Sequence, residues 1–261
     1  MSKKEKVIFL GNGPLAEYAL AVIERECQVI FHARRKEDLE EVKRLKAENP
    51  EAHGILASFG VLIPDSVLEL FESEGILNVH PSLLPLYRGA SPIESAILAG
   101  DSDFSVSVMK LVKAMDAGPI YFQTTLSDLP LRKNDIYKAL AETGAEWIVK
   151  NLTNLSEPVL QDDSKATYCG KLDKSMSLLT PEVDTAEQTF RKIVAFQGYP
   201  KPKYKFFEIP CIVIEAHVLK PSEKVLLTIP CADDGIVAVD KLQPEGRKVM
   251  DAKAFLNGYK K

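Results

Sequence analysis

The first 156 residues alternate between short apolar runs and longer amphipathic stretches. The apolar runs have the length of buried strands, and the stretches between them repeat apolar residues at the spacing of one helical face. This pattern predicts strands at 6–10, 28–32, 52–59, 75–80, 104–112 and 118–128, and helices within 11–26, 36–50, 64–74, 91–100 and 134–156. Strands that alternate with helices predict an α/β domain built on a doubly wound, mainly parallel sheet.

The pattern changes after residue 156. A polar stretch with few aromatic residues, 157–174, is expected to be a linker, and a helix is expected around 186–196. Short apolar runs bounded by Pro, Gly and Asp then follow at 207–219, 224–231, 235–244 and 249–258. Such closely spaced strands favour a small, partly open, OB-like β-barrel. We therefore expect a catalytic domain at 1–156, a linker at 157–174 and a C-terminal β-barrel domain at 175–261.

Composition narrows the classes of protein. The chain is 46% hydrophobic and 27% charged, as in ordinary globular proteins. No apolar run approaches the ~18 residues of a membrane span, and the run at 7–10 is far shorter than the core of a signal peptide. The four cysteines are scattered without metal-ligand spacing. We expect a cytoplasmic protein without a metal centre, a membrane association or an obligate protein partner.

The most informative motif is the stretch 75–89, which reads GILNVHPSLLPLYRG. Asn78 and His80 are two positions apart on a predicted strand, so they project from the same face, and Pro81 ends the strand. An amide and an imidazole at a strand end can stabilise a carbonyl oxygen that becomes an oxyanion and can move a proton. For an isolated N-x-H pair, the alternative is a buried structural Asn beside a strand-end His.

The wider pattern, N-x-H-x-S-L-L-P-x-x-R-G with a downstream D-x-G at 116–118, resembles the folate-dependent formyltransferases. The stretch 242–260 is similar to the end of the C-terminal domain in members that act on methionyl-tRNA. The resemblance implies the formyltransferase fold and formyl transfer from 10-formyltetrahydrofolate, the co-substrate, to the amino group of methionyl-tRNA. It implies that the catalytic residues are Asn78, His80 and Asp116. The folate pocket would be bordered by Ser82, Leu83, Leu84, Pro85, Phe59, Gly60 and Val61.

The formyl acceptor is less clearly indicated. Residues 171–261 carry a net charge of +3 and residues 1–170 a net charge of −7, together −4, which fits either a polyanion held by the C-terminal part or an ordinary solvated surface. Charged initiator tRNA is the expected partner, and the candidate contacts are Arg34, Arg35, Lys36, Arg88, Lys201, Lys203 and Lys205. The basic loop that the family carries after its second strand is shortened here. A small amine such as an amino-sugar nucleotide therefore remains an alternative acceptor, and a non-catalytic folate-binding protein is a further one.

The turn after the first strand, Gly11-Asn12-Gly13, faintly resembles a dinucleotide fingerprint. Its third glycine is missing, because Ala16 stands at that position, and no acidic residue is suitably placed for a ribose. We therefore expect no nicotinamide cofactor.

Overall fold

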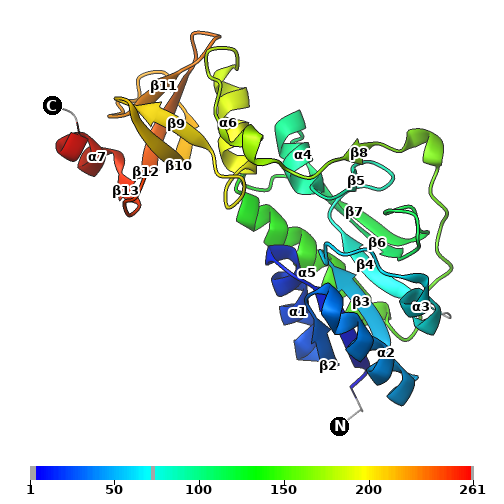
Figure 1. Ribbon diagram of the computed structural model, residues 1–261. Coiled ribbons are helices and arrows are strands. Elements are labelled where there is room, and N and C mark those ends of the chain that lie inside the picture. Colours follow the sequence, from blue (N-terminus) through cyan, green and yellow to red (C-terminus); the bar gives the residue numbers. More distant parts are fainter. Residues whose placement is uncertain (1–3, 72–73, 260–261) are drawn as a thin grey trace. The chain divides into compact units, whose positions relative to one another are not determined.

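The computed structural model describes residues 4–71 and 74–259 (Figure 1). The chain divides into two compact units. The first contains the residues up to 93 together with 102–170, and the second contains 94–101 together with the residues from 171 onward. The predicted helix at 64–74 includes residues 72–73, which lie outside the described part of the chain.

The first unit is built on a six-stranded sheet in the order β2-β1-β3-β4-β6-β7. The strands are β1 (Lys6–Gly11), β2 (Gln28–Ala33), β3 (His53–Ala57), β4 (Ile76–His80), β6 (Phe104–Lys110) and β7 (Ile120–Leu126). The strands β2, β1, β3 and β4 pair in parallel, whereas β6 pairs antiparallel with both β4 and β7. The predicted doubly wound, mainly parallel sheet is confirmed, with an antiparallel pair at one edge.

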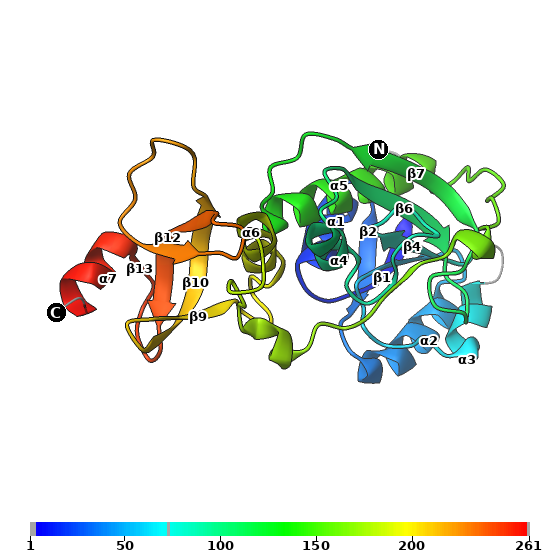
Figure 2. The same ribbon diagram turned by 90° about the horizontal axis from the view of Figure 1, so that it is seen from above.

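Helices cover both faces of this sheet (Figures 1 and 2). One face carries α1 (Pro14–Glu26) and α5 (Lys133–Asn151), which pack against each other. The other face carries α2 (Leu39–Glu48) and α3 (Asp65–Leu68), with 3-10 turns at Lys36–Asp38 and Glu69–Phe71. The helix α4 (Pro92–Ala99) follows the motif strand. In α5, a Cβ at Gly144 would lie 2.7 Å from Val79 Cγ1, so this glycine lets the helix approach β4 closely.

The second unit contains α6 (Ala186–Ala195) and a curled antiparallel sheet in the order β11-β12-β10-β9. These strands are β9 (Lys203–Phe206), β10 (Ile209–Val218), β11 (Thr228–Pro230) and β12 (Ile236–Pro244), and β13 (Met250–Asp251) pairs with β12. Their apolar residues, among them Val213, Val237 and Phe255, form a separate core. The small, partly open barrel expected from the sequence is present as this curled antiparallel sheet.

The predicted strand at 249–258 is wrong over most of its length. Only Met250–Asp251 is a strand, and α7 (Ala252–Tyr259) follows it. The Asp251 carboxylate accepts a hydrogen bond from the Ala254 backbone N–H at 2.7 Å, which satisfies one free donor of the first helical turn. Ala252 and Phe255 are buried three positions apart, at helical spacing.

The polar segment 159–169, called here the strap, lies along the first unit. Val159 forms an antiparallel bridge with Ile120, and β8 (Tyr168–Cys169) pairs in parallel with β5 (Arg88–Gly89). A 3-10 turn at Asp163–Lys165 lies between these pairings. The strap therefore contacts both the loop after β4 and the start of β7.

Candidate functional site

Asn78 and His80 stand at the carboxyl end of β4, as the sequence predicted. They are 5% and 4% exposed, and every residue of β4 is buried. Val79, between them, faces α5 on the opposite side of the sheet. The structure shows no hydrogen bond from the Asn78 carboxamide to another described residue, so its N–H groups are free to meet a ligand.

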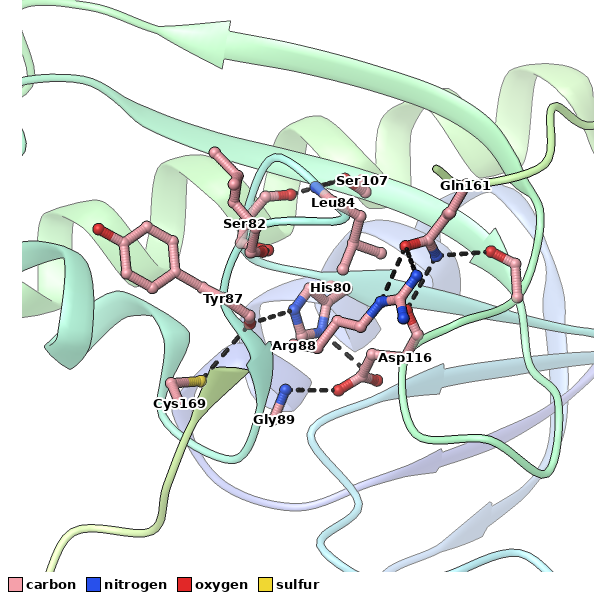
Figure 3. A network of polar contacts seen from close by, with 12 residues as sticks. His80, Ser82, Leu84, Tyr87, Arg88, Gly89, Ser107, Asp116, Gln161 and Cys169 are labelled. Atoms are coloured by element: carbon pink, nitrogen blue, oxygen red, sulfur yellow. Dashed lines mark hydrogen bonds and ion pairs between the residues drawn. The ribbon is translucent and has the colours of Figure 1, made fainter. Parts of the chain in front are cut away.

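Asp116 reaches His80 from the turn between β6 and β7 (Figure 3). Its Oδ1 lies 3.6 Å from His80 Nδ1, and its Oδ2 accepts a hydrogen bond from the Gly89 backbone N–H at 2.8 Å. The carboxylate is 14% exposed. Asp116 has a φ of 50°, a left-handed conformation that aspartate tolerates better than most residues. Of the three residues that the motifs singled out, the structure therefore places His80 and Asp116 opposite each other, 3.6 Å apart.

His80 has a defined orientation. Its Nε2 lies 3.1 Å from the carbonyl oxygen of Tyr87, and a carbonyl only accepts, so we assign the proton to Nε2. Burial lowers the pKa of His80, while the Asp116 carboxylate and the Tyr87 carbonyl oppose this effect without cancelling it. The ring is therefore neutral near neutral pH, and its Nδ1 faces the carboxylate with a free lone pair.

Two glycines of the sequence motifs are required by close backbone approach. A Cβ at Gly118, the last residue of D-x-G, would collide with the carbonyl oxygen of Lys110. Gly89, the glycine of R-G, has a φ of 129°, and its Cβ would collide with the carbonyl oxygen of Cys169. Both glycines therefore serve to bring the turn of Asp116 and the strap against the site.

The loop that follows His80 is fixed from beneath by β6 and β7. Ser107 Oγ donates to the carbonyl of Ser82 at 2.6 Å and accepts from the Leu84 N–H at 3.1 Å. Gln123 Nε2 donates to the carbonyl of Leu84 at 2.8 Å and to Ser107 Oγ at 2.8 Å. Ser82 and Leu84 are buried, whereas Leu83 is 41% exposed. Among these residues, Leu83 offers its side chain to a ligand.

The other expected folate contacts are placed as follows. Pro85 is partly exposed, and Phe59 is 4% exposed within the core beneath α2 and α3. Gly60 has a φ of 70° and is exposed, and Val61 is partly exposed. Gly60, Val61 and Pro85 are therefore accessible to a ligand, whereas Phe59 is part of the buried core.

Arg88 is enclosed by the strap (Figure 3). Its guanidinium is 3% exposed and donates to Gln161 Oε1 from Nε at 3.1 Å and from Nη2 at 2.8 Å. Nη2 also pairs with Asp163 Oδ1 at 2.6 Å. Gln161 Nε2 in turn donates to the backbone carbonyls of Asp116 at 2.8 Å and Gly118 at 2.7 Å. We therefore do not assign Arg88 the phosphate contact that the sequence suggested.

The remaining basic candidates lie on the surface. Arg34, Arg35 and Lys36 are exposed, and Arg35 forms an ion pair with Asp38. In the second unit, the three candidates on and just before the edge strand β9 are exposed at alternate positions, namely Lys201, Lys203 and Lys205.

Sequence reasoning missed the polar residues that support the site, above all Ser107, Gln123 and Gln161. Ser107 could have been noticed, because a serine that alternates with apolar residues in a strand as buried as β6 needs a polar partner. Gln161 gave no comparable signal, since it lies in an aperiodic polar stretch. Within residues 4–71 and 74–259, no cluster of three metal-ligating side chains is found. No helix in the same ranges is long and apolar enough to cross a membrane.

The fold and the site define a class: an α/β protein whose strand-end amide and imidazole, with a carboxylate facing the imidazole, suit the transfer of an acyl-type group. The chain belongs to the formyl transferase family, because residues 1–152 match the family's "Formyl transferase" domain and residues 182–260 match its "Formyl transferase, C-terminal domain". The resemblance seen in the motifs is thereby confirmed.

Individual relatives agree with this assignment. The methionyl-tRNA formyltransferase of Granulibacter bethesdensis is 32% identical over 247 residues, which cover 89% of this chain and 76% of that protein. The structure of methionyl-tRNA formyltransferase from Clostridium thermocellum superposes with a TM-score of 0.67 at 19% identity, covering 95% of this chain and 99% of the other. HypX from Aquifex aeolicus, solved with tetrahydrofolic acid, gives a TM-score of 0.77 at 18% identity, and this chain spans 48% of its length. At such identities the two structures establish the fold.

Proposed function

We propose that this protein transfers the formyl group of 10-formyltetrahydrofolate to the amino group of methionyl-tRNA. The observation that carries the proposal is the position of Asn78 and His80 at the end of β4, with Asp116 3.6 Å from the imidazole, in a chain of the formyl transferase family. The named relatives of similar sequence support the choice of acceptor.

The first step is attack of the neutral amine on the formyl carbon. A bond forms between the amine nitrogen and this carbon, and the carbonyl electron pair moves onto oxygen, which gives a tetrahedral oxyanion. The Asn78 carboxamide donates a hydrogen bond to that oxygen. A preorganised donor of this kind is typically worth ~10²–10³-fold in rate.

The second step moves one proton. The attacking nitrogen becomes cationic and releases its proton to the pair formed by His80 Nδ1 and the Asp116 carboxylate, directly or through a water. The bond from carbon to the folate nitrogen then breaks, the carbonyl re-forms, and the pair returns the proton to that nitrogen. Atoms and charges balance, and the protein ends as it began. The neutral state that burial imposes on His80 leaves Nδ1 able to accept this proton.

The folate would lie against the surface at Gly60, Val61, Leu83 and Pro85. Hydrogen bonds from Ser107 and Gln123 hold the loop 82–86, so Leu83 and Pro85 are in place before the ligand arrives. Binding of 5-formyltetrahydrofolate should raise the melting temperature, and above the dissociation constant this shift should grow with the logarithm of the ligand concentration.

We further propose that the second unit contributes affinity for the tRNA backbone through Lys201, Lys203 and Lys205. Lys203 and Lys205 share one face of β9 and can follow a line of phosphates, and Lys201, which precedes the strand with a φ of 78°, adds a third positive charge to the segment. Replacing all three by Ala should flatten the dependence of log K on log salt by about one unit for each phosphate that is no longer neutralised. If this salt dependence is unchanged, the three lysines are ordinary solvated surface residues and do not contact the tRNA.

The decisive experiment is a formylation assay with 10-formyltetrahydrofolate and three acceptors: initiator methionyl-tRNA, elongator methionyl-tRNA and a panel of amino-sugar nucleotides. We expect both tRNAs to react with modest discrimination, because the basic loop after β2 is short. Reaction with a sugar nucleotide alone would replace the proposed acceptor. Folate binding without transfer to any amine would indicate a binding protein.

A further inference from the structure

We propose that Gln161 is a positioning residue of the reaction, and that the strap is therefore part of the active site. Its carboxamide joins the backbone of the Asp116 turn to the Arg88 guanidinium and so holds the carboxylate against His80 (Figure 3). The inference rests on the proposed formyl transfer, but the effect of Gln161 on the position of Asp116 can be measured without turnover.

All the polar capacity of the Gln161 side chain is directed to this region. The two N–H groups donate to the carbonyls of Asp116 and Gly118, and the oxygen accepts twice from Arg88. Arg88 can only donate and the carbonyls can only accept, so the amide has one orientation that satisfies every partner. The bridge is therefore directional and cannot be replaced by a side chain of the same size that lacks either half.

The Asp116 turn needs such an anchor. The preceding residue, Met115, is 61% exposed, and the turn's own backbone bond from Ala117 N–H to the Ala114 carbonyl is long, at 3.3 Å. Asp116 also adopts a positive φ, which its surroundings must maintain. Without Gln161, the turn would keep the bond from Gly89 N–H to the carboxylate but lose the two bonds to its carbonyls.

Arg88 extends the same support to the other side of the carboxylate. It precedes Gly89, whose N–H binds Asp116 Oδ2, and Asp163 offsets its buried charge. Its own N–H donates to the Thr167 carbonyl, and the Ala90 N–H donates to the Cys169 carbonyl. The strap therefore fixes both groups that contact Asp116: the turn that carries it and the N–H that binds it.

Two substitutions separate the halves of the bridge. Gln161→Leu keeps a similar volume and removes all four bonds. Gln161→Glu keeps the acceptor for Arg88 but loses the donors to the Asp116 and Gly118 carbonyls. Displacement of a reacting group by about 1 Å can cost ~10²-fold in rate. We expect both variants to lower kcat by about 10- to 100-fold while the KM for folate and for the acceptor stays within about threefold.

The matched control is Gln243→Leu. Gln243 lies on β12 in the second unit and also donates to a backbone carbonyl, that of Arg247, at 2.9 Å. It should leave kcat unchanged. If Gln161 had a purely structural role, its replacement would lower the melting temperature and the amount of active enzyme, but not the turnover of the folded fraction.

The second measurement is an NMR titration of the His80 ring in the substrate-free protein. A loosened Asp116 supports the protonated imidazole less, so the midpoint for His80 should fall in the neutral variant Gln161→Leu and not in Gln243→Leu. Wild-type kcat and an unchanged His80 midpoint in Gln161→Leu would overturn the inference. If the wild-type protein formylates none of the acceptors, the proposed function fails, while the His80 titration still decides whether Gln161 positions Asp116.

Discussion

The replacement Asp116→Asn tests the centre of the proposed mechanism. Asparagine keeps the size of the side chain, and its carbonyl oxygen can still accept the hydrogen bond from the Gly89 N–H. The variant lacks the negative charge opposite His80 Nδ1 and the group that shares the proton with it. The substitution therefore isolates electrostatics from packing.

The magnitude follows from the geometry. When the imidazole takes up the amine's proton, it becomes a cation 3.6 Å from a carboxylate that is 14% exposed. At an effective dielectric constant of about 20, this pair is worth roughly 4–5 kcal/mol. Since each 1.36 kcal/mol is a factor of ten in rate, kcat should fall by about 10³-fold. General-base groups typically contribute ~10²–10⁴-fold, so the two estimates agree.

The assay is steady-state formylation of methionyl-tRNA by the purified variant, with circular dichroism and thermal melting to verify folding. We expect the KM for folate to change little, because Asp116 acts on the proton of the attacking amine. Asp184→Asn is the matched control, since Asp184 is a similarly buried aspartate, 13% exposed, that pairs with Lys192 in the second unit. Turnover within threefold of wild type in Asp116→Asn would refute the assignment of Asp116 as a partner in proton transfer.

Three further predictions concern other parts of the chain. Asn78→Ala should lower kcat by about 10²–10³-fold, and its effect should not add to that of the first variant because both act on one transition state, as a double-variant cycle will reveal. Gly118→Ala should destabilise the fold by about 3 kcal/mol, measurable by urea unfolding, because the new Cβ meets a carbonyl of β6. Hydrogen bonds from His217 to Asp240 and Glu223 raise the pKa of His217. Its stabilisation is therefore fully present below pH ~6.5 and lost as the pH rises through the folded-state pKa. The ring is a third exposed, so His217→Gln should cost only about 0.5 kcal/mol at pH 5.5 and nothing at pH 9.

The parts of the fold that the sequence predicts are those with a strong period. The run Ile76–His80 is apolar enough to be a buried strand, and the position of Asn78 and His80 on one face follows from the alternation of a strand. The helix α6 was predicted for the same kind of reason, and the Thr185 side chain caps it by accepting from the Gln188 N–H. Such elements are determined by local composition.

The parts that escaped prediction depend on contacts between distant segments. Residues 157–174 carry no periodic pattern, so they suggested a linker, yet Gln161 binds the Asp116 turn 45 positions away. The sequence also does not predict that Arg88 is buried, because a basic residue beside a loop is usually exposed. Only the three-dimensional pairing of β5 with β8 shows that its partners come from the strap.

The contrast between His80 and Asp116 explains why such distant support exists. His80 is carried by a strand with neighbours on both sides, so its position is set by the sheet itself. Asp116 lies on a short, partly exposed turn with a positive φ, a structure that cannot hold a carboxylate at a fixed distance by its own bonds. His80 Nδ1 and Asp116 Oδ1 are 3.6 Å apart, and in the proposed mechanism they share a proton. Both side chains must therefore be held in place, since a shift comparable to a water's radius would separate them too far for this transfer. Because Gly118 and Gly89 have no Cβ, the backbone segments around Asp116 can approach one another closely. The strap can then hold the Asp116 turn in place through hydrogen bonds from Gln161. In the proposed mechanism, the two glycines and the polar strap are therefore needed as much as the residues that would touch the substrate.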